Sequence, residues 1–245
     1  MSINLKKWLF ENDYPYMEKD GFIIVKELNL FEKGLKKLPN FSKVIVLGDF
    51  KCFYNELTSL VGAPQKVGGD FICSNNKLKD LIGVPQKVGG TFDCSHNELK
   101  NLVGAPQKVD GDFICSYNKI SSLFGGPKKV GGDFICSSNK LKKLSGVPQK
   151  ILGNFCCDFN KLTSLMGGPK EVGGIFDCSY NNLKKLAGAP QKVGGRFCCS
   201  HNYLSDFIDA PKSVDDYSLY QHKKPVVRIK SHSAFKNVDK SKTRE

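Results

Sequence analysis

Apolar residues recur along the chain at a constant spacing of 21 residues. Leucine or isoleucine holds one such position from Leu57 to Leu204, proline a second from Pro64 to Pro211, and phenylalanine a third from Phe50 to Phe197. Cysteine and asparagine keep the same period, and a degenerate earlier copy begins at Leu35. The consensus is L-x-x-L-x-G-x-P-x-x-V-x-G-x-F-x-C-S-x-N-x. Such a period predicts a stack of similar units rather than one globular core.

Each unit predicts a short strand followed by a tight return. The segment F-x-C alternates apolar and polar residues, which places Phe and Cys on the inner face of a strand. We expect the following Asn in a turn, where its amide bonds the backbone of its own and the neighbouring coil. L-x-x-L adds two core side chains, and Gly and Pro then impose a non-helical return that is extended or 3₁₀. The Gly pair before the strand is expected to permit a sharp corner.

A unit of this length cannot bury its own apolar face, so the units must stack. The predicted fold is a solenoid with a curved parallel sheet on its concave face and a small N-terminal α/β cap. Within that cap, residues 3–12 predict a short helix, and residues 21–30 a strand added to the first coil. The expected organisation is a cap over 1–34, about eight full repeats and one degenerate repeat over 35–214, a second cap over 215–230, and a basic disordered tail over 231–245.

The repeat resembles a known class of repeat protein. F-x-C-x-x-N-x-L-x-x-L is similar to the core segment of leucine-rich repeats, with Phe and Cys in two of the usual Leu positions. The P-x-x-V return resembles the short repeats of secreted bacterial effector proteins. The form G-x-P-x-x-V-x-G-x-F-x-C-S-x-N resembles leucine-rich repeats encoded by tailed phages and large viruses. The resemblance covers residues 35–214 and implies protein binding without naming a partner.

Composition narrows the function classes. The formal net charge is +13, and 40% of residues are hydrophobic, but no long apolar run indicates a membrane span. The N-terminus lacks a signal-peptide pattern, so we expect a cytoplasmic protein, in the host cytoplasm if it is viral. A basic balance favours an acidic partner such as nucleic acid, although lysine is also a common solvated residue on repeat surfaces.

Ten cysteines raise the alternatives of disulfides, a metal site or a core ladder of free thiols. Zinc-ligand spacing is absent, and without export the thiols should stay reduced, so we favour the core ladder. Cys156 and Cys198 each precede a repeat cysteine and should point outward, either as contacts or as simple replacements for Ile. No Ser–His–Asp, HExxH or phosphate-loop pattern occurs. We therefore expect a protein that is not an enzyme, with no catalytic residue, metal or cofactor.

Residues flanking Phe and Cys should project onto the concave face. They include acids, isoleucines and aromatic residues, which on a rigid scaffold favour a protein-binding surface over ordinary surface variation. The predicted partner-binding residues are Asp70, Ile72, Asp93, His96, Asp112, Ile114, Tyr117, Asp133, Ile135, Phe159, Asp177, Tyr180 and His201. The first hypothesis is therefore a protein-interaction module, with a virus-encoded factor that engages a host protein as its extension.

Lysines recur elsewhere in the repeat, most regularly in the return. The return lysines are Lys66, Lys87, Lys108, Lys129, Lys150 and Lys192. The second hypothesis is nucleic-acid or ribonucleoprotein binding through these ladders and the basic C-terminal tail. It is the weaker one, because arginine is nearly absent from the repeats and no aromatic platform accompanies the lysines. We expect no membrane partner, and either a monomer or a dimer paired through an exposed sheet edge.

Overall fold

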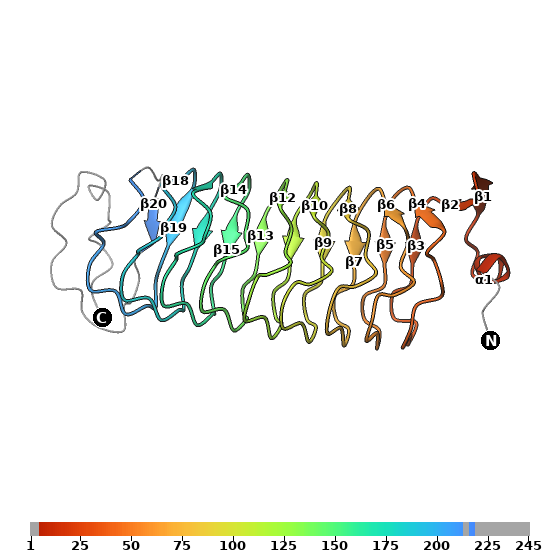
Figure 1. Ribbon diagram of the computed structural model, residues 1–245, viewed down its shortest axis with the longest axis horizontal. Helices are drawn as coiled ribbons and strands as arrows, with labels where there is room; N and C mark the ends of the chain where they lie inside the picture. Colours follow the sequence, from red (N-terminus) through yellow and green to blue (C-terminus); the bar gives the residue numbers. More distant parts are fainter. Residues whose placement is uncertain (1–4, 213–215, 219–245) are drawn as a thin grey trace, which may run out of the picture.

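The structure is a computed structural model that describes residues 5–212 and 216–218. The chain winds into one row of coils, with α1 and β1 at one end and β20 (Asp216–Ser218) at the other (Figure 1). The predicted tail over 231–245, and nearly all of the predicted C-terminal cap over 215–230, lie outside the described residues. The division of the chain into these segments therefore stays a prediction.

A small α/β cap precedes the coils. It consists of α1 (Leu5–Glu11) and a hairpin of β1 (Tyr16–Lys19) with β2 (Phe22–Val25). Leu9 is fully buried, and the Trp8 ring meets the Phe41 ring edge-on at a centroid distance of 5.5 Å. The cap predicted from the sequence is confirmed, and the helix covers the apolar end of the first coil.

Residues 21–30 contribute to the first coil twice. β2 pairs in parallel with β4 (Val44–Val46), and β3 (Leu28–Asn29) pairs in parallel with β5 (Phe50–Lys51). The strand predicted here is confirmed, but it is split into two strands that join different sheets. The cap is thereby hydrogen-bonded to both sides of the solenoid.

The F-x-C segments form one parallel sheet, which we call the front sheet. Each phenylalanine is in register with the phenylalanine of the next coil, as Phe113 is with Phe92 and Phe134. This sheet has ten strands, β3, β5 and β20 among them. The others are β7 (Phe71–Ile72), β9 (Phe92–Asp93), β11 (Phe113–Ile114), β13 (Phe134–Ile135), β15 (Phe155–Cys156), β17 (Phe176–Asp177) and β19 (Arg196–Cys198).

The returns are extended, and they are themselves paired. β1, β2 and β4 continue into a seven-stranded sheet, and the last three returns form a separate three-stranded sheet. We call these the return sheets. Among the described residues none is 3₁₀, so the extended alternative is the one found. Their strands are β6 (Lys66–Val67), β8 (Lys87–Val88), β10 (Lys108–Val109), β12 (Lys129–Val130), β14 (Lys150–Ile151), β16 (Glu171–Val172) and β18 (Lys192–Val193).

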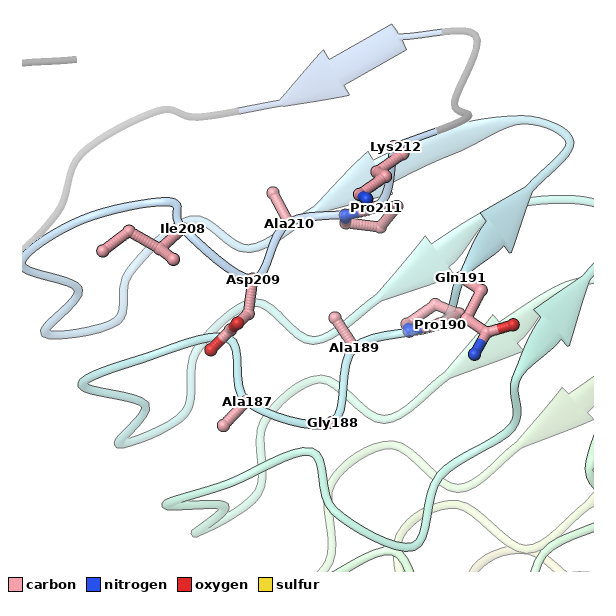
Figure 2. Close-up of a pocket in the computed structure, with 10 residues that line it drawn as sticks. All are labelled: Ala187, Gly188, Ala189, Pro190, Gln191, Ile208, Asp209, Ala210, Pro211 and Lys212. Carbon is pink, nitrogen blue, oxygen red and sulfur yellow. The ribbon is translucent and has the colours of Figure 1, made fainter. Parts of the chain in front are cut away.

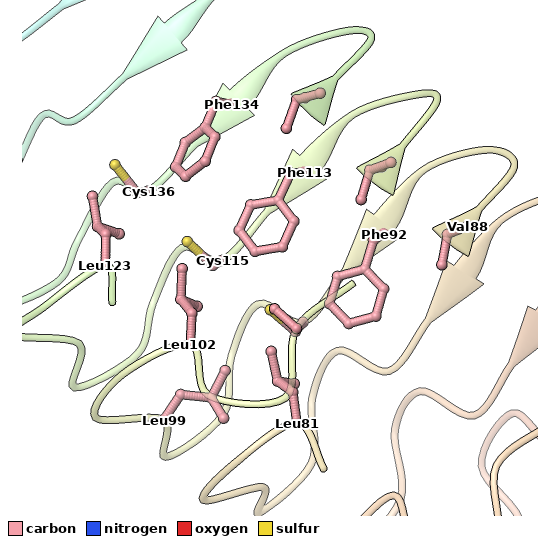
Figure 3. Close-up of a cluster of buried hydrophobic side chains, with 14 of the residues drawn as sticks. Leu81, Val88, Phe92, Leu99, Leu102, Phe113, Cys115, Leu123, Phe134 and Cys136 are labelled. Atoms are coloured by element: carbon pink, nitrogen blue, oxygen red, sulfur yellow. The ribbon is translucent and has the colours of Figure 1, made fainter. Parts of the chain in front are cut away.

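The core lies between the two kinds of sheet and repeats from coil to coil (Figure 3). Phe92 and Phe113 are fully buried, and their rings stack at 5.7 Å. Cys115 and Leu102 are also fully buried beside them. Because each side chain packs on its own copy one coil away, burial depends on neighbours and not on a single unit.

A ladder of asparagines joins the turns that follow the front strands. Asn118 Nδ2 donates to the carbonyl oxygens of Cys115 and Ser116 in its own coil, at 3.2 Å each, and to that of Cys94 in the preceding coil at 3.0 Å. Its Oδ1 accepts from the N–H of Leu99 at 3.0 Å. The same bonding recurs from Asn76 to Asn202. The predicted role of this residue is confirmed.

The glycines before the front strands have a different role from the one expected. Neither Gly131 nor Gly132 has a positive φ, so backbone freedom is not what the corner requires. Instead, a Cβ on Gly131 would lie 2.0 Å from the carbonyl oxygen of Asp110. A Cβ on Gly132 would lie 2.0 Å from Oδ1 of Asp112. The second glycine recurs at Gly111, Gly132 and Gly153 because adjacent coils approach too closely there for a side chain, whereas the first position admits Asp110 and Leu152.

Candidate protein-binding face

The outer face of the front sheet presents three columns of side chains, each with one member per coil. The strand-start column precedes the phenylalanines and comprises Asp49, Asp70, Thr91, Asp112, Asp133, Asn154, Ile175 and Arg196. The mid-strand column lies between Phe and Cys and comprises Lys51, Ile72, Asp93, Ile114, Ile135, Cys156, Asp177 and Cys198. The turn column precedes the ladder asparagines and comprises Tyr54, Asn75, His96, Tyr117, Ser138, Phe159, Tyr180 and His201. All thirteen predicted partner-binding residues fall in these columns.

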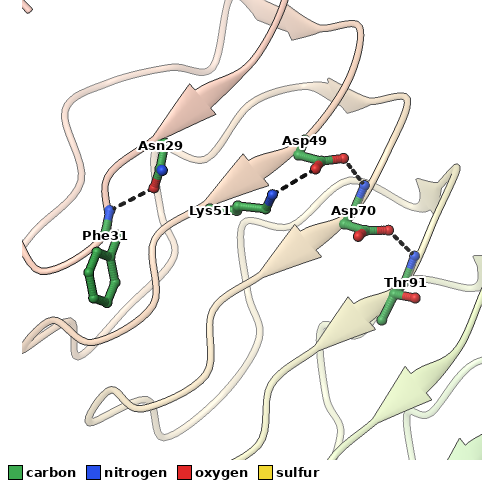
Figure 4. Close-up of polar contacts among 6 residues, drawn as sticks. All are labelled: Asn29, Phe31, Asp49, Lys51, Asp70 and Thr91. Carbon is green, nitrogen blue, oxygen red and sulfur yellow. Dashed lines mark hydrogen bonds and ion pairs between the residues drawn. The ribbon is translucent and has the colours of Figure 1, made fainter.

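Carboxylates of the strand-start column bond the backbone of the next coil. Asp49 Oδ1 accepts from the Asp70 N–H at 2.9 Å, and Asp70 Oδ1 accepts from the Thr91 N–H at 2.7 Å (Figure 4). Asp112 and Asp133 repeat this bond one coil apart, to the N–H groups of Asp133 and Asn154. At least one oxygen of each predicted aspartate in this column, and both oxygens of Asp133, are therefore engaged in holding coils together, which the sequence did not indicate.

The mid-strand column is half-buried, and its acids are also engaged by the backbone. Asp177 Oδ1 accepts from the N–H of Ser179 at 2.9 Å, and Asp93 bonds Ser95 in the same way. Burial raises the pKa of Asp177, with a further contribution from the charge of Asp158. Burial, with the nearby acids, also raises the pKa of the Cys156 thiol to about 12. The outward direction predicted for Cys156 agrees with its partial exposure.

The turn column is the most exposed of the three. Its residues share a left-handed backbone, with φ between 51° and 54°. His96 stacks on Tyr117 at 4.4 Å, and Tyr180 stacks on Phe159 at 4.2 Å and on His201 at 4.0 Å. The interplanar angles are 9° to 12°, so the rings lie nearly parallel. Tyr117 and Phe159 are 57% and 51% exposed, which leaves much of this aromatic surface open to solvent.

The charges of the molecule are divided between faces. The strand-start and mid-strand columns hold six aspartates against Lys51 and Arg196, and Lys51 is paired with Asp49 at 2.8 Å. The return lysines stand in register on the return sheets, as Lys108 does with Lys87 and Lys129. Asp110 lies among them and pairs with Lys87 and Lys108 at 3.0 and 2.7 Å. The front face is therefore acidic although the net charge of the protein is positive.

Sequence reasoning missed several residues of this face. Tyr54 belongs to the turn column, and its ring lies edge-on to Phe31 at a centroid distance of 5.9 Å. Aligning the first full repeat with the later ones reveals Tyr54, but Phe31 lies outside the repeat and has no such signal. A separate exposed apolar column also escaped notice, although it keeps the 21-residue period. Its large exposed apolar members are Val61, Ile82, Val103, Phe124, Met166 and Ile208.

A surface pocket lies between the segment that leads into β18 and the equivalent segment of the next coil, away from the front sheet (Figure 2). It is lined by residues 187–191 and 208–212. Small and apolar side chains predominate, and Asp209 and Lys212 are the charged ones. This lining does not assemble a nucleophile with a general base. Among the described residues, no three His, Cys, Asp or Glu side chains are grouped to hold a metal, and none of the helices there could cross a bilayer.

No family model matches the sequence, and no curated protein matches it. The structure is similar to that of YopM from Yersinia enterocolitica WA-314, with a TM-score of 0.52 and 23% sequence identity. The similarity covers 75% of this chain and 43% of YopM, so the chain spans less than half of that protein. The protein is a leucine-rich-repeat solenoid, which confirms the fold class predicted from its repeat. Scaffolds of this class expose a regular sheet as a binding surface.

Proposed function

We propose that the protein is a non-catalytic protein-interaction module that binds its partner through the outer face of the front sheet. The observation that carries the proposal is the turn column, where exposed aromatic rings stack beside aspartates on a hydrogen-bonded sheet. Aromatic residues held rigidly bury much area at small entropic cost, and they are enriched among the residues that dominate binding energy. The acids beside them favour a partner with basic and apolar groups.

The proposal of a viral origin rests on what the repeats resemble. Since they are similar to those of phage and large-virus proteins, we propose a virus-encoded factor that engages a host protein in the host cytoplasm. No cofactor is required for such a role.

The test is affinity capture from a cell lysate with and without nuclease, using substitutions that the chain's own repeats already contain. Tyr117→Ser alters the proposed face, and Ser138 shows that serine fits this backbone position. Lys129→Glu alters the return sheet, where Glu171 occupies the same column. Phe124→Ser alters the exposed apolar column, where serine stands at position 145. We expect that one protein is captured, that nuclease treatment does not prevent its capture, and that Tyr117→Ser is the only one of the three variants that abolishes it. Loss with Phe124→Ser alone would place the binding surface elsewhere and refute the proposal.

Nucleic-acid binding is the second candidate, because the return lysines stand in register along consecutive coils. Such binding would fall steeply with salt, disappear with nuclease and weaken with Lys129→Glu. The pairing of Asp110 with two of these lysines reduces the positive field there. The same capture experiment therefore separates the two functions.

A further inference from the structure

The turn column is interrupted where Ser138 replaces an aromatic residue. Tyr117, Ser138 and Phe159 occupy consecutive coils in register. The Tyr117 N–H donates to the backbone carbonyl oxygen of Ser137 at 3.2 Å, and the Ser138 N–H donates to that of Asp158 at 3.0 Å. Tyr117 is stacked on its other side by His96, and Phe159 by Tyr180. Each ring therefore turns its remaining face toward the position where Ser138 has no ring.

The gap has the thickness of one planar group. Adjacent coils are separated by about 4.8 Å, so Tyr117 and Phe159 lie roughly 9 to 10 Å apart across the serine. A planar group inserted midway would lie about 4.5 to 5 Å from each ring. This compares with 4.0 to 4.4 Å between the rings that already stack in this column. An incoming group would continue the stack in place of the missing ring.

The second departure from the repeat places a negative charge beside the same gap. Asp158 stands where the neighbouring coils have Ser137 and Ser179, and it immediately precedes Phe159. Its Oδ1 accepts a hydrogen bond from the Ser137 hydroxyl, so the carboxylate is fixed between the coils of Ser138 and Phe159. Asp133 and Asp177 add negative charge on the adjoining strands.

A planar cation satisfies both features. An arginine guanidinium is flat, stacks on aromatic faces, and donates in a fork that matches a carboxylate. A lysine ammonium carries the charge without the plane, and a nucleotide base brings the plane with a phosphate that the acids would repel. We infer that the slot between Tyr117 and Phe159, floored by Ser138 and flanked by Asp158, binds an arginine side chain of the partner protein. The inference rests on the proposed function and names the chemistry of the partner at one position.

The backbone permits variants that close or weaken the slot. Ser138 has a φ of 54°, and Tyr117 and Phe159 adopt 54° and 51° with aromatic side chains. Ser138→Phe is therefore compatible with the local conformation and would fill the gap. Asp158→Ser restores the residue common at that repeat position. Asn75→Phe, in the turn column but three coils from Ser138, is the matched control, since it adds a ring where no acid replaces the serine.

The experiment titrates the full chain with an acetylated and amidated Gly-Arg-Gly peptide and follows the arginine side-chain protons by NMR. We expect the two rings to shift these protons upfield, and the Gly-Lys-Gly peptide to bind roughly ten-fold more weakly. Ser138→Phe should abolish the shift, Asp158→Ser should weaken binding several-fold, and Asn75→Phe should leave it unchanged. Tyr117→Ser, once shown to be folded, removes the ring on one side of the slot and should independently weaken binding of the peptide.

Equal binding of the two peptides, an unchanged shift in Ser138→Phe, or preferential binding of adenosine monophosphate or a Gly-Trp-Gly peptide would each overturn the arginine assignment. The two proposals fail separately. If partner capture is lost with Tyr117→Ser while Ser138→Phe leaves the peptide shift intact, the slot is wrong and the interaction face stands. If the peptide binds as expected but capture ignores Tyr117→Ser, the slot exists and the proposed interaction face is wrong.

Discussion

The side-chain amide of Asn118 donates to the carbonyl oxygen of Cys94 at 3.0 Å and thereby ties one coil to the preceding one. Asn118 is only 8% exposed, so this bond lies away from solvent. The ladder asparagines thus have a structural role in every coil, distinct from that of the exposed residues that precede them.

Replacing Asn118 with alanine should therefore destabilise the protein strongly. The change leaves the N–H of Leu99 buried without its acceptor and removes one of the two amide donors to the carbonyl oxygen of Cys94, and we expect a loss of about 2 to 4 kcal/mol in the free energy of unfolding. Urea denaturation followed by circular dichroism measures it. Asn75→Ser is the control, because Ser138 occupies the equivalent position. A loss for Asn118→Ala no greater than that of the control would show that the ladder does not stabilise the coils.

The glycine contacts make a second stability prediction. Gly111→Ala should cost about 3 kcal/mol, because its Cβ would lie 2.8 Å from the backbone of Gly90 and Thr91 in the preceding coil and neither backbone segment can move freely. Gly34→Ala is the comparison, because Gly34 has a φ of 63° but open space around its Cβ position. It should cost about 1 kcal/mol from the left-handed conformation alone. Thermal unfolding of both variants tests the difference. An equal cost would mean that the coils can separate to admit a methyl group.

Much of this fold follows from its sequence period. The spacing of Phe, Cys, Asn and Leu determines the direction of each side chain, and the asparagine ladder follows from placing a side-chain amide in a buried turn. The pairing of the return strands was not predicted, since two residues such as Lys108 and Val109 carry no recognisable strand pattern. Their pairing results from stacking, which brings identical backbones into register.

The sequence predicted which residues form the candidate face, but not the hydrogen bonds that they make. Alternation places Asp70 and Asp112 on the outer face, yet it cannot show that their carboxylates bond the next coil, because that depends on the approach of backbone N–H groups across coils. The slot at Ser138 is likewise invisible to residue-by-residue reasoning. It arises from the rings on both sides, and therefore from the distance between coils.

The cysteines predict a sharp division in chemical reactivity. The eight repeat cysteines are buried, and burial raises the pKa of a thiol such as Cys115 far above its ordinary value. Cys156 and Cys198 are partly exposed. Iodoacetamide at pH 8 should therefore modify at most these two thiols in the native protein and all ten after denaturation, as counted by intact mass.

Even Cys156 should react slowly. With a pKa of about 12, roughly one molecule in ten thousand carries its thiolate at pH 8, and the rate should rise about ten-fold per pH unit above that. Cys156→Ser and Cys198→Ser assign the two sites. Rapid modification of more than two thiols in the folded protein would contradict the buried cysteine ladder.

Two aspartates of the front face should affect stability in opposite directions as pH changes. Burial raises the pKa of Asp177, so the folded state binds its proton more tightly than the unfolded state does. The contribution of Asp177 to stability is then greatest in acid and is lost as pH rises from its ordinary value of 3.8 through the raised value. The hydrogen bond from Lys51 lowers the pKa of Asp49, so its contribution is present at neutral pH and is lost as pH falls below 3.8.

Asparagine substitutions at these two positions test the signs. At pH 7, Asp177→Asn should raise the free energy of unfolding by up to about 1 kcal/mol, because asparagine removes a buried charge and still accepts from Ser179. Asp49→Asn should lower it by only about half a kcal/mol, because its ion pair with Lys51 is solvent-screened. Urea denaturation between pH 3 and 7 measures both, and both differences should shrink toward the acid end as the wild-type carboxylates become protonated. Destabilisation by Asp177→Asn at pH 7 would mean that this carboxylate has a favourable ionic partner in the folded protein, and that the front face is less acidic than its columns indicate.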